Sequence, residues 1–181
     1  GYPVYTSGPV LAGAEAFLLP LLDRLDFTPD LDAIPDEKLA AARLMFINYP
    51  NNPTGAIVPD GFFERVVEFA REHRLMVVHD FAYADLAFDG YRPPSFLEVP
   101  GAREVGVELF SMTKSYNMAG WRLAFACGNR QMIHALARIG QVVAHGIAQS
   151  GAPNAARARS TRAAFSFVGR TQMSMSFVSL G

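Results

Sequence analysis

The stretch "LMFINYPNNPTGAIVPDGFFERVVEFAREHRLMVVHD" (44–80) decides the fold of this chain. Its two short apolar runs, at 44–48 and 75–80, are typical of buried strands. Between them, apolar residues recur at helical spacing in "DGFFERVVEFAREHR" (60–74), with a charged exposed face and Asp60 as the expected N-cap. A strand, a helix and a strand in this order form a βαβ unit, which predicts a parallel sheet.

Two more strands and a second helix are predicted downstream. "EVGVELFSM" (104–112) and "RLAFACG" (122–128) read as strands, and "NRQMIHALARIGQVVAHGI" (129–147) reads as an amphipathic helix capped by Asn129. Cys127, inside the second of these strands, is expected to be a small core residue. The residues thus predict one α/β domain.

Composition excludes several classes of protein. The 181 residues are 50% hydrophobic and 18% charged, with a net charge of −1, so neither nucleic acid nor an anionic membrane is an expected partner. No apolar run approaches the length of a membrane span. A single cysteine rules out an internal disulfide and fits a reducing cytoplasm.

Charge is distributed unevenly along the chain. No acidic residue lies beyond Glu108, whereas eight of the 16 lysines and arginines do. A basic nucleic-acid-binding arm is one interpretation, but these cations are scattered and form no lysine cluster. Residues 151–181 show no sustained periodicity, so we expect an atypical, poorly ordered tail, in which any strand would form an exposed edge.

The topology gathers several reactive side chains at one edge of the sheet. Parallel strands joined by right-handed crossovers end at the same edge, where ligands of open α/β sheets bind. The first three predicted strands bring an amide, a carboxylate, a hydroxyl and a lysine there, and the next strand can add a fixed cation. These side chains belong to Asn52, Asp80, Ser111, Lys114 and Arg122.

Lys114 is one of only two lysines in a chain that otherwise uses arginine. A lysine amine can lose its proton and attack a carbonyl, which a guanidinium cannot do. Lys114 can therefore form a Schiff base with an aldehyde. Asp80 ends an apolar strand, so it needs a buried partner such as a protonated pyridine nitrogen.

The remaining polar residues complete the pattern of one ligand. Ser111 and Arg122 suit a phosphate, and Asn52 and Tyr83 are donors for a phenolate oxygen. Pyridoxal 5′-phosphate carries all of these groups. Any one of the residues alone has an ordinary structural explanation, such as a capping hydroxyl or a tight turn, so only the combination indicates the cofactor.

Three motifs carry a resemblance to a known family. "YPNNPTG" (49–55), "HDFAYADLAFDG" (79–90) and "SMTKSYNMAGWR" (111–122) resemble the signature stretches of the class I/II, fold-type I aminotransferases, in the branch of LL-diaminopimelate aminotransferases and alanine-forming transaminases. The resemblance covers roughly residues 1–148. It implies the three-layer, mostly parallel α/β large domain of that family, truncated at both ends, with residues 1–150 as the central part of the cofactor-binding domain.

The resemblance also implies a role for each site residue. Lys114 would be the Schiff-base lysine and proton shuttle, and Asp80 the partner of the pyridine nitrogen. Asn52 and Tyr83 would hold the phenolate oxygen. The phosphate would be held by Ser111, Thr113 and Arg122, and Tyr2 would lie near the cofactor ring. No metal ligand is expected.

The implied activity is transfer of an amino group between an L-amino acid and a 2-oxo acid, in a full-length form that is a homodimer. The small domain and the glycine-rich phosphate turn of the family have no counterpart here, so we expect no turnover by these 181 residues alone. Two alternatives remain open. One is another fold-type I enzyme, such as a β-lyase or an acyl-transferring synthase. The other is a non-enzymatic sensor domain of a transcription regulator.

Overall fold

The βαβ unit of the opening stretch is present, and it forms the centre of the molecule. Strand β2 (Ala42–Asn48), helix α3 (Phe62–Glu72) and strand β3 (Met76–Asp80) follow one another along the chain. The two strands pair in parallel, and their last residues, Asn48 and Asp80, stand opposite each other. The prediction of a parallel strand pair from the apolar runs is therefore confirmed.

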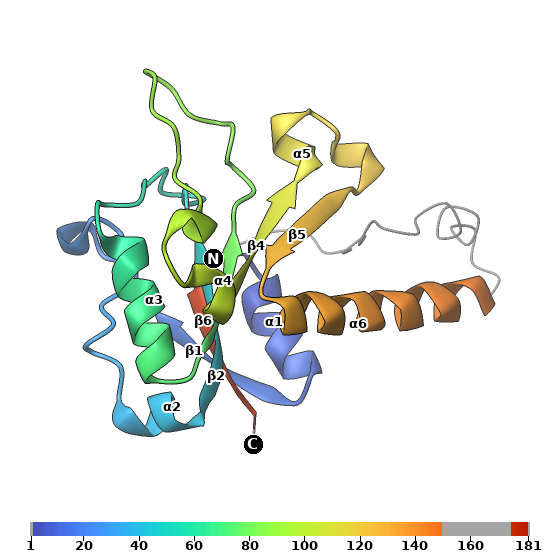
Figure 1. The fold of residues 1–181 in the computed structure, drawn as a ribbon, viewed down its shortest axis with the longest axis horizontal. Coiled ribbons are helices and arrows are strands. Elements are labelled where there is room, and N and C mark those ends of the chain that lie inside the picture. The colour runs from blue at the N-terminus through green and yellow to red at the C-terminus, as the bar shows by residue number, and fades with distance from the viewer. Residues whose placement is uncertain (1, 150–174, 181) are drawn as a thin grey trace.

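The structure, a computed structural model, describes residues 2–149 and 175–180 (Figure 1). The elements before the βαβ unit are α1 (Val4–Leu11), β1 (Ala14–Leu19), η1 (Asp23–Leu25) and α2 (Asp36–Ala41). Those after it are η2 (Phe96–Glu98), α4 (Ala102–Val105), β4 (Gly106–Ser111), α5 (Met112–Ser115), η3 (Ala119–Trp121), β5 (Ala124–Gly128), α6 (Arg130–Gln149) and β6 (Met175–Leu180).

The strands form one six-stranded sheet in the order β1-β6-β2-β3-β4-β5. β2, β3 and β4 are parallel neighbours. β1 shares their direction, because β1 and β2 are both antiparallel to β6. Only β5 and β6 run against the other four, which confirms a mostly parallel sheet.

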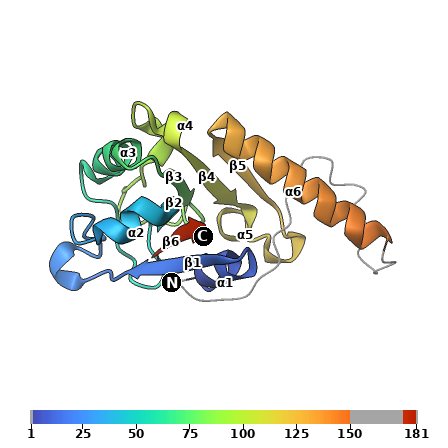
Figure 2. The same ribbon diagram turned by 90° about the horizontal axis from the view of Figure 1, so that it is seen from below.

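Side-chain alternation along the central strands shows that helices cover both faces of the sheet. Met45 and Ile47 of β2 belong to the core cluster that contains α3. Phe46, between them, points to the opposite face, where its ring stacks on Tyr5 of α1 at a centroid distance of 5.2 Å. Figure 2 shows α3 and α4 on one side of the sheet and α1 on the other. The implied three-layer arrangement is present.

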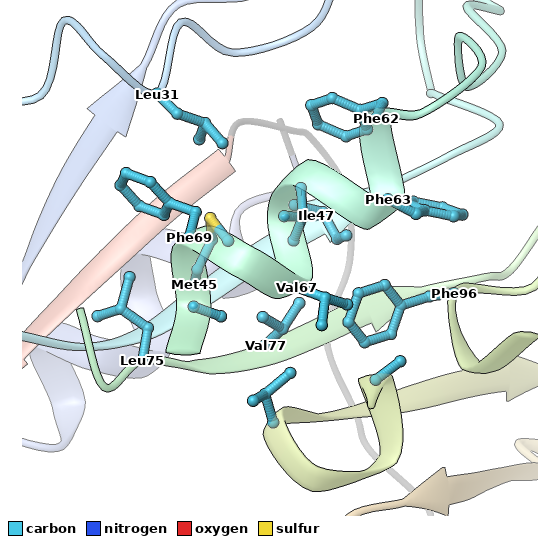
Figure 3. Close-up of a cluster of buried hydrophobic side chains, with 14 of the residues drawn as sticks. Leu31, Met45, Ile47, Phe62, Phe63, Val67, Phe69, Leu75, Val77 and Phe96 are labelled. Atoms are coloured by element: carbon cyan, nitrogen blue, oxygen red, sulfur yellow. The ribbon is translucent and has the colours of Figure 1, made fainter. Parts of the chain in front are cut away.

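The main core lies between α3 and the sheet. Figure 3 shows apolar side chains of α3 packed against β2 and β3, with Phe96 of η2 beside them. Phe96, Ile47 and Val77 are fully buried, with no exposed surface. The α3 residues predicted to form its apolar face are all buried, namely Phe62, Phe63, Val66, Val67 and Ala70.

Of the two predicted N-caps, that of α6 is confirmed and that of α3 is wrong. Asn129 Oδ1 accepts the backbone N–H groups of Gln131 and Met132 at 2.9 and 3.1 Å, so the predicted cap of α6 is confirmed. Asp60 is not the cap of α3. That position belongs to Gly61, whose φ of 79° lies in the left-handed region that glycine tolerates.

Two predictions about β6 and β5 were wrong. Residues 175–180, expected to be an exposed edge if they formed a strand, instead lie inside the sheet as β6, between β1 and β2. The rest of the tail that we expected to be poorly ordered, residues 151–174 and 181, lies outside the described residues. Cys127 is exposed rather than buried in the core, and it lies on β5, an edge strand of the sheet.

No helix in the part of the chain that the structure describes combines the length and the apolarity that a bilayer crossing requires.

Substitution of Gly106 tests the packing of β4 against β3 and η2. A Cβ at this position would lie 2.8 Å from the backbone oxygen of Val77 and 2.8 Å from the Phe96 ring. We expect Gly106→Ala to lower the free energy of unfolding by about 1–3 kcal/mol, because the backbone oxygen cannot move aside cheaply. A Cβ at Gly120 meets nothing within 4 Å. Gly120→Ala should therefore change that free energy by less than about 0.5 kcal/mol in the same urea titration. Equal effects of the two substitutions would contradict this packing.

Candidate active site

Three parallel strands end at the edge of the sheet where the sequence predicted a site. β2 ends at Asn48 and β3 at Asp80, which face each other across the pair. β4 continues past its Asp80 partner, Leu109, to Ser111. The residues that follow these strands therefore share one edge, as the topology required.

Asp80 is partly buried at this edge, and two neighbours hold it. The hydroxyl of Tyr5 donates a hydrogen bond to Asp80 Oδ2. Asn48 Nδ2 donates to the backbone oxygen of Asp80 at 2.8 Å. Burial raises the pKa of the Asp80 carboxyl, and the hydrogen bond from Tyr5 opposes that effect without cancelling it. A cationic partner would favour the ionised form, which a neutral hydroxyl does only weakly.

Tyr5 is a site residue that the sequence analysis missed. It lies on α1, only 5% exposed, and its ring stacks on Phe46 of the sheet. Burial, and then the negative charge of Asp80, raises the pKa of Tyr5, so its hydroxyl remains a donor. The predicted residue Tyr2 touches Tyr5 edge-on, with ring centroids 5.9 Å apart. Tyr2 and Tyr5 are three residues apart at the start of a helix, and residues at this spacing are neighbours on a helix surface. This spacing could have added Tyr5 to the predicted site beside Tyr2.

Asn52 and Tyr83, predicted to act together, are in contact. Asn52 Nδ2 donates to the Tyr83 hydroxyl oxygen at 2.7 Å. Burial raises the pKa of Tyr83, and the hydrogen bond from Asn52 lowers it. The backbone N–H of Asn52 donates to Asn48 Oδ1 at 3.2 Å, so the same asparagine, Asn48, contacts both the loop and Asp80.

Lys114 lies on α5, directly after β4, with an exposed side chain. Its Nζ sits 5.6 Å from the centre of the Tyr83 ring, a cation–π distance. Ser111 Oγ accepts the backbone N–H of Thr113 at 3.2 Å and so caps the turn that carries the lysine. The structure therefore joins Lys114 to the Asn52–Tyr83 pair and joins Ser111 to Thr113.

Arg122 returns to the same edge by way of an antiparallel turn. Ala124 of β5 pairs with Ser111, so Arg122 lies two residues from that pair. Its Nη1 donates to the backbone oxygen of Ala119 at 3.2 Å, and the side chain is exposed. Its φ of 52° places it in the left-handed region, uncommon for a residue other than glycine.

The donor set fits the groups of pyridoxal phosphate. A partly buried carboxyl with a raised pKa suits a protonated ring nitrogen. The Asn52 amide and the Tyr83 hydroxyl suit a ring oxygen, and the amine of Lys114 beside Tyr83 suits an aldehyde. Hydroxyl and guanidinium groups near Ser111 suit a phosphate.

Comparison with known proteins identifies the family of the chain. Residues 1–171 match the protein family described as "Aminotransferase class I and II". The chain is 58% identical over 139 residues to the LL-diaminopimelate aminotransferase of Moorella thermoacetica, a match that covers 77% of this chain and 36% of that protein.

Two solved structures show the likeness in three dimensions. Substrate-bound BacF from Bacillus subtilis is 47% identical with a TM-score of 0.71, over 75% of this chain and 34% of BacF. The probable N-succinyldiaminopimelate aminotransferase of Thermus thermophilus is 43% identical with a TM-score of 0.73, over 79% and 38% of the two chains. The chain thus spans little more than a third of the length of these relatives.

Asp80→Asn should stabilise the chain when no cofactor is bound. Because burial raises the pKa of Asp80 in the folded state, folding is disfavoured once Asp80 is ionised, and stability is lost as the pH rises through that raised value. Asparagine removes the charge and keeps an oxygen that can accept from Tyr5. At pH 7, we expect the free energy of unfolding to rise by on the order of 1–3 kcal/mol.

The gain should vanish below about pH 4, the ordinary carboxyl pKa, where both the folded and the unfolded chain carry a protonated Asp80. Urea unfolding at the two pH values measures the difference. The same change at the exposed Asp85 is the control and should have little effect. A variant that is less stable than the natural chain at neutral pH would show that Asp80 already has a sufficient partner.

Proposed function

Since this chain belongs to the class I and II aminotransferase family, whose members depend on pyridoxal phosphate, we propose that it forms the cofactor-binding part of an aminotransferase. The observation that carries this proposal is the convergence of three parallel strands on one edge. There Asp80, Asn52, Tyr83 and Lys114 present the groups that this cofactor requires.

Asp80 and Tyr5 serve the ring-nitrogen side of the proposed site. Pyridoxal phosphate, when bound, supplies an aldehyde and an electron-accepting ring. Asp80 would accept a charged hydrogen bond from the ring N–H and so would keep the proton on that nitrogen. The Tyr5 hydroxyl holds the carboxylate in place from α1, and Tyr2, which packs against Tyr5, would lie beside the ring.

Lys114 serves the aldehyde side. Its amine would hold the aldehyde of the cofactor, and the same amine could move the Cα proton of an amino acid bound there. Asn52 and Tyr83 orient the ring oxygen by hydrogen bonds. Ser111, Thr113 and Arg122 hold the phosphate at the start of α5 and at the β5 end of the same turn.

The proposed reaction moves an amino group between an L-amino acid and a 2-oxo acid. The relative from Moorella thermoacetica is named an LL-diaminopimelate aminotransferase, which favours LL-diaminopimelate as one substrate. A β-lyase would instead release ammonia from the amino acid, and a sensor domain would bind the cofactor without turnover. We further propose a cytoplasmic homodimer, which the family resemblance and the single cysteine support.

Borohydride trapping tests the role of Lys114. After incubation with pyridoxal phosphate and reduction, peptide mapping should locate the label on Lys114. Lys38 is the natural control, because its hydrogen bond to Glu15 at 2.6 Å raises its pKa and keeps it protonated. Lys114→Arg should abolish specific labelling, and Lys38→Arg should leave it unchanged. Equal labelling of both lysines, or none, would overturn the assignment.

A chimaera tests the reaction class. The residues of this chain that match the Moorella thermoacetica enzyme can replace the aligned segment of that enzyme. We expect the chimaera to form a 2-oxo acid from LL-diaminopimelate only when a second 2-oxo acid is present. Lys114→Arg should lower the rate by several orders of magnitude, since a guanidinium at this position cannot form a Schiff base. Release of ammonia without an acceptor would favour the lyase, and trapping without any turnover would favour the sensor.

A further inference from the structure

A second polar cluster lies behind the proposed site, on the opposite face of the sheet. His79, the residue before Asp80, is fully buried, with 0% of its side chain exposed. Its Nδ1 lies 2.9 Å from Glu108 Oε2, and its Nε2 lies 3.0 Å from the backbone oxygen of Tyr49. Alternation along β3 points His79 toward α3 and Asp80 toward α1.

The hydrogen bonds determine where the protons must be. A backbone oxygen only accepts, so Nε2 of His79 must carry a proton toward Tyr49. Glu108 Oε2 also accepts the backbone N–H of Phe96 at 2.8 Å, and Ser95 Oγ donates to Glu108 Oε1 at 2.9 Å. A carboxylate that receives these donors is an acceptor for Nδ1 as well, so each ring nitrogen faces an acceptor.

The surroundings of the ring are otherwise apolar. Phe81 stacks on the imidazole at 5.0 Å, and Phe63 meets it edge-on at 5.0 Å. Asp80, the next residue after His79, is a charged neighbour. His79 lowers the pKa of the Asp80 carboxyl, whereas burial raises it.

The cluster ties together the segments that carry the site. Tyr49 begins the loop that leads to Asn52, His79 precedes Asp80, and Glu108 lies three residues before Ser111. His79 and Glu108 are direct neighbours across β3 and β4. Through Ser95 and Phe96, the same carboxylate also holds the start of η2.

We propose that His79 and Glu108 form a buried imidazolium–carboxylate pair that acts as a positioning device for the cofactor site. The pair sets the spacing between the loop that carries Asn52, the end of β3 that carries Asp80 and the strand that leads to Ser111. Neither residue touches the cofactor, so both act through the residues they hold. This inference rests on the proposed function.

The protonation of the pair is measured without any cofactor. In a ¹⁵N-labelled sample of the chain at neutral pH, both ring nitrogens of His79 should show the chemical shifts of protonated nitrogens. A single unprotonated ring nitrogen would overturn the proposal. This measurement needs no variant, so it holds even if substitutions in the cluster prevent folding.

Glu108→Gln tests the positioning role. Glutamine removes the negative charge that holds the His79 imidazolium. Once Nδ1 has lost its proton it needs a donor, and one amide atom cannot donate to His79 and also accept from Phe96, so the arrangement must change. At a temperature where both proteins are fully folded, the pyridoxal phosphate concentration that half-saturates Lys114 trapping should rise by about tenfold or more. Glu104→Gln is the matched control, since that side chain is 73% exposed and pairs with Arg71 on the surface. It should leave trapping unchanged.

The outcomes separate the two proposals. If Glu108→Gln lowers the unfolding temperature but leaves the half-saturating concentration unchanged, the pair only stabilises the fold and the positioning role is wrong. If the natural chain shows no label at Lys114, the proposed function is wrong. The ¹⁵N chemical shifts of His79 would still show whether the imidazolium–carboxylate pair exists.

Discussion

Strand β3 is covered on both faces, and its last two residues are both ionisable. Because strand side chains alternate, His79 and Asp80 must enter opposite layers of the molecule, and each needs polar partners from its own side. The α3 side supplies Glu108 and the backbone of Tyr49, and the α1 side supplies Tyr5. Most of the architecture around the proposed site follows from these two requirements.

The two faces of the sheet differ in how fully they supply polar partners to His79 and Asp80. On the α3 side, both nitrogens of His79 have partners and the Glu108 carboxylate accepts several donors. On the α1 side, Asp80 has a neutral hydroxyl, and burial still raises its pKa. The sheet thus has one satisfied face and one face where a cation would be stabilised. If the proposed function is right, this arrangement trades stability of the free chain for binding of a cationic ring.

The lysine and arginine of the proposed site are held less firmly than Asp80. Lys114 and Arg122 are exposed and lie on the short turn between β4 and β5. The position of the turn depends on local contacts, such as the Ser111 cap and the bond from the Met112 N–H to the Leu123 oxygen at 3.1 Å. A firmly held carboxylate beside exposed cations suits a site whose cofactor orders the outer groups when it binds.

The sequence by itself determined the central βαβ unit, the apolar face of α3, the Asn129 cap and the edge at which Asn52, Asp80 and Ser111 meet. These features follow from local periodicity and from the rule that parallel strands end together. Tertiary structure alone decided that Tyr5 reaches Asp80, that β6 enters the sheet between β1 and β2, and that Cys127 is exposed. It also decided that His79 and Glu108 are neighbours. Each of these depends on pairing between residues far apart in the chain, and a local pattern carries no information about which distant segment fills a given face.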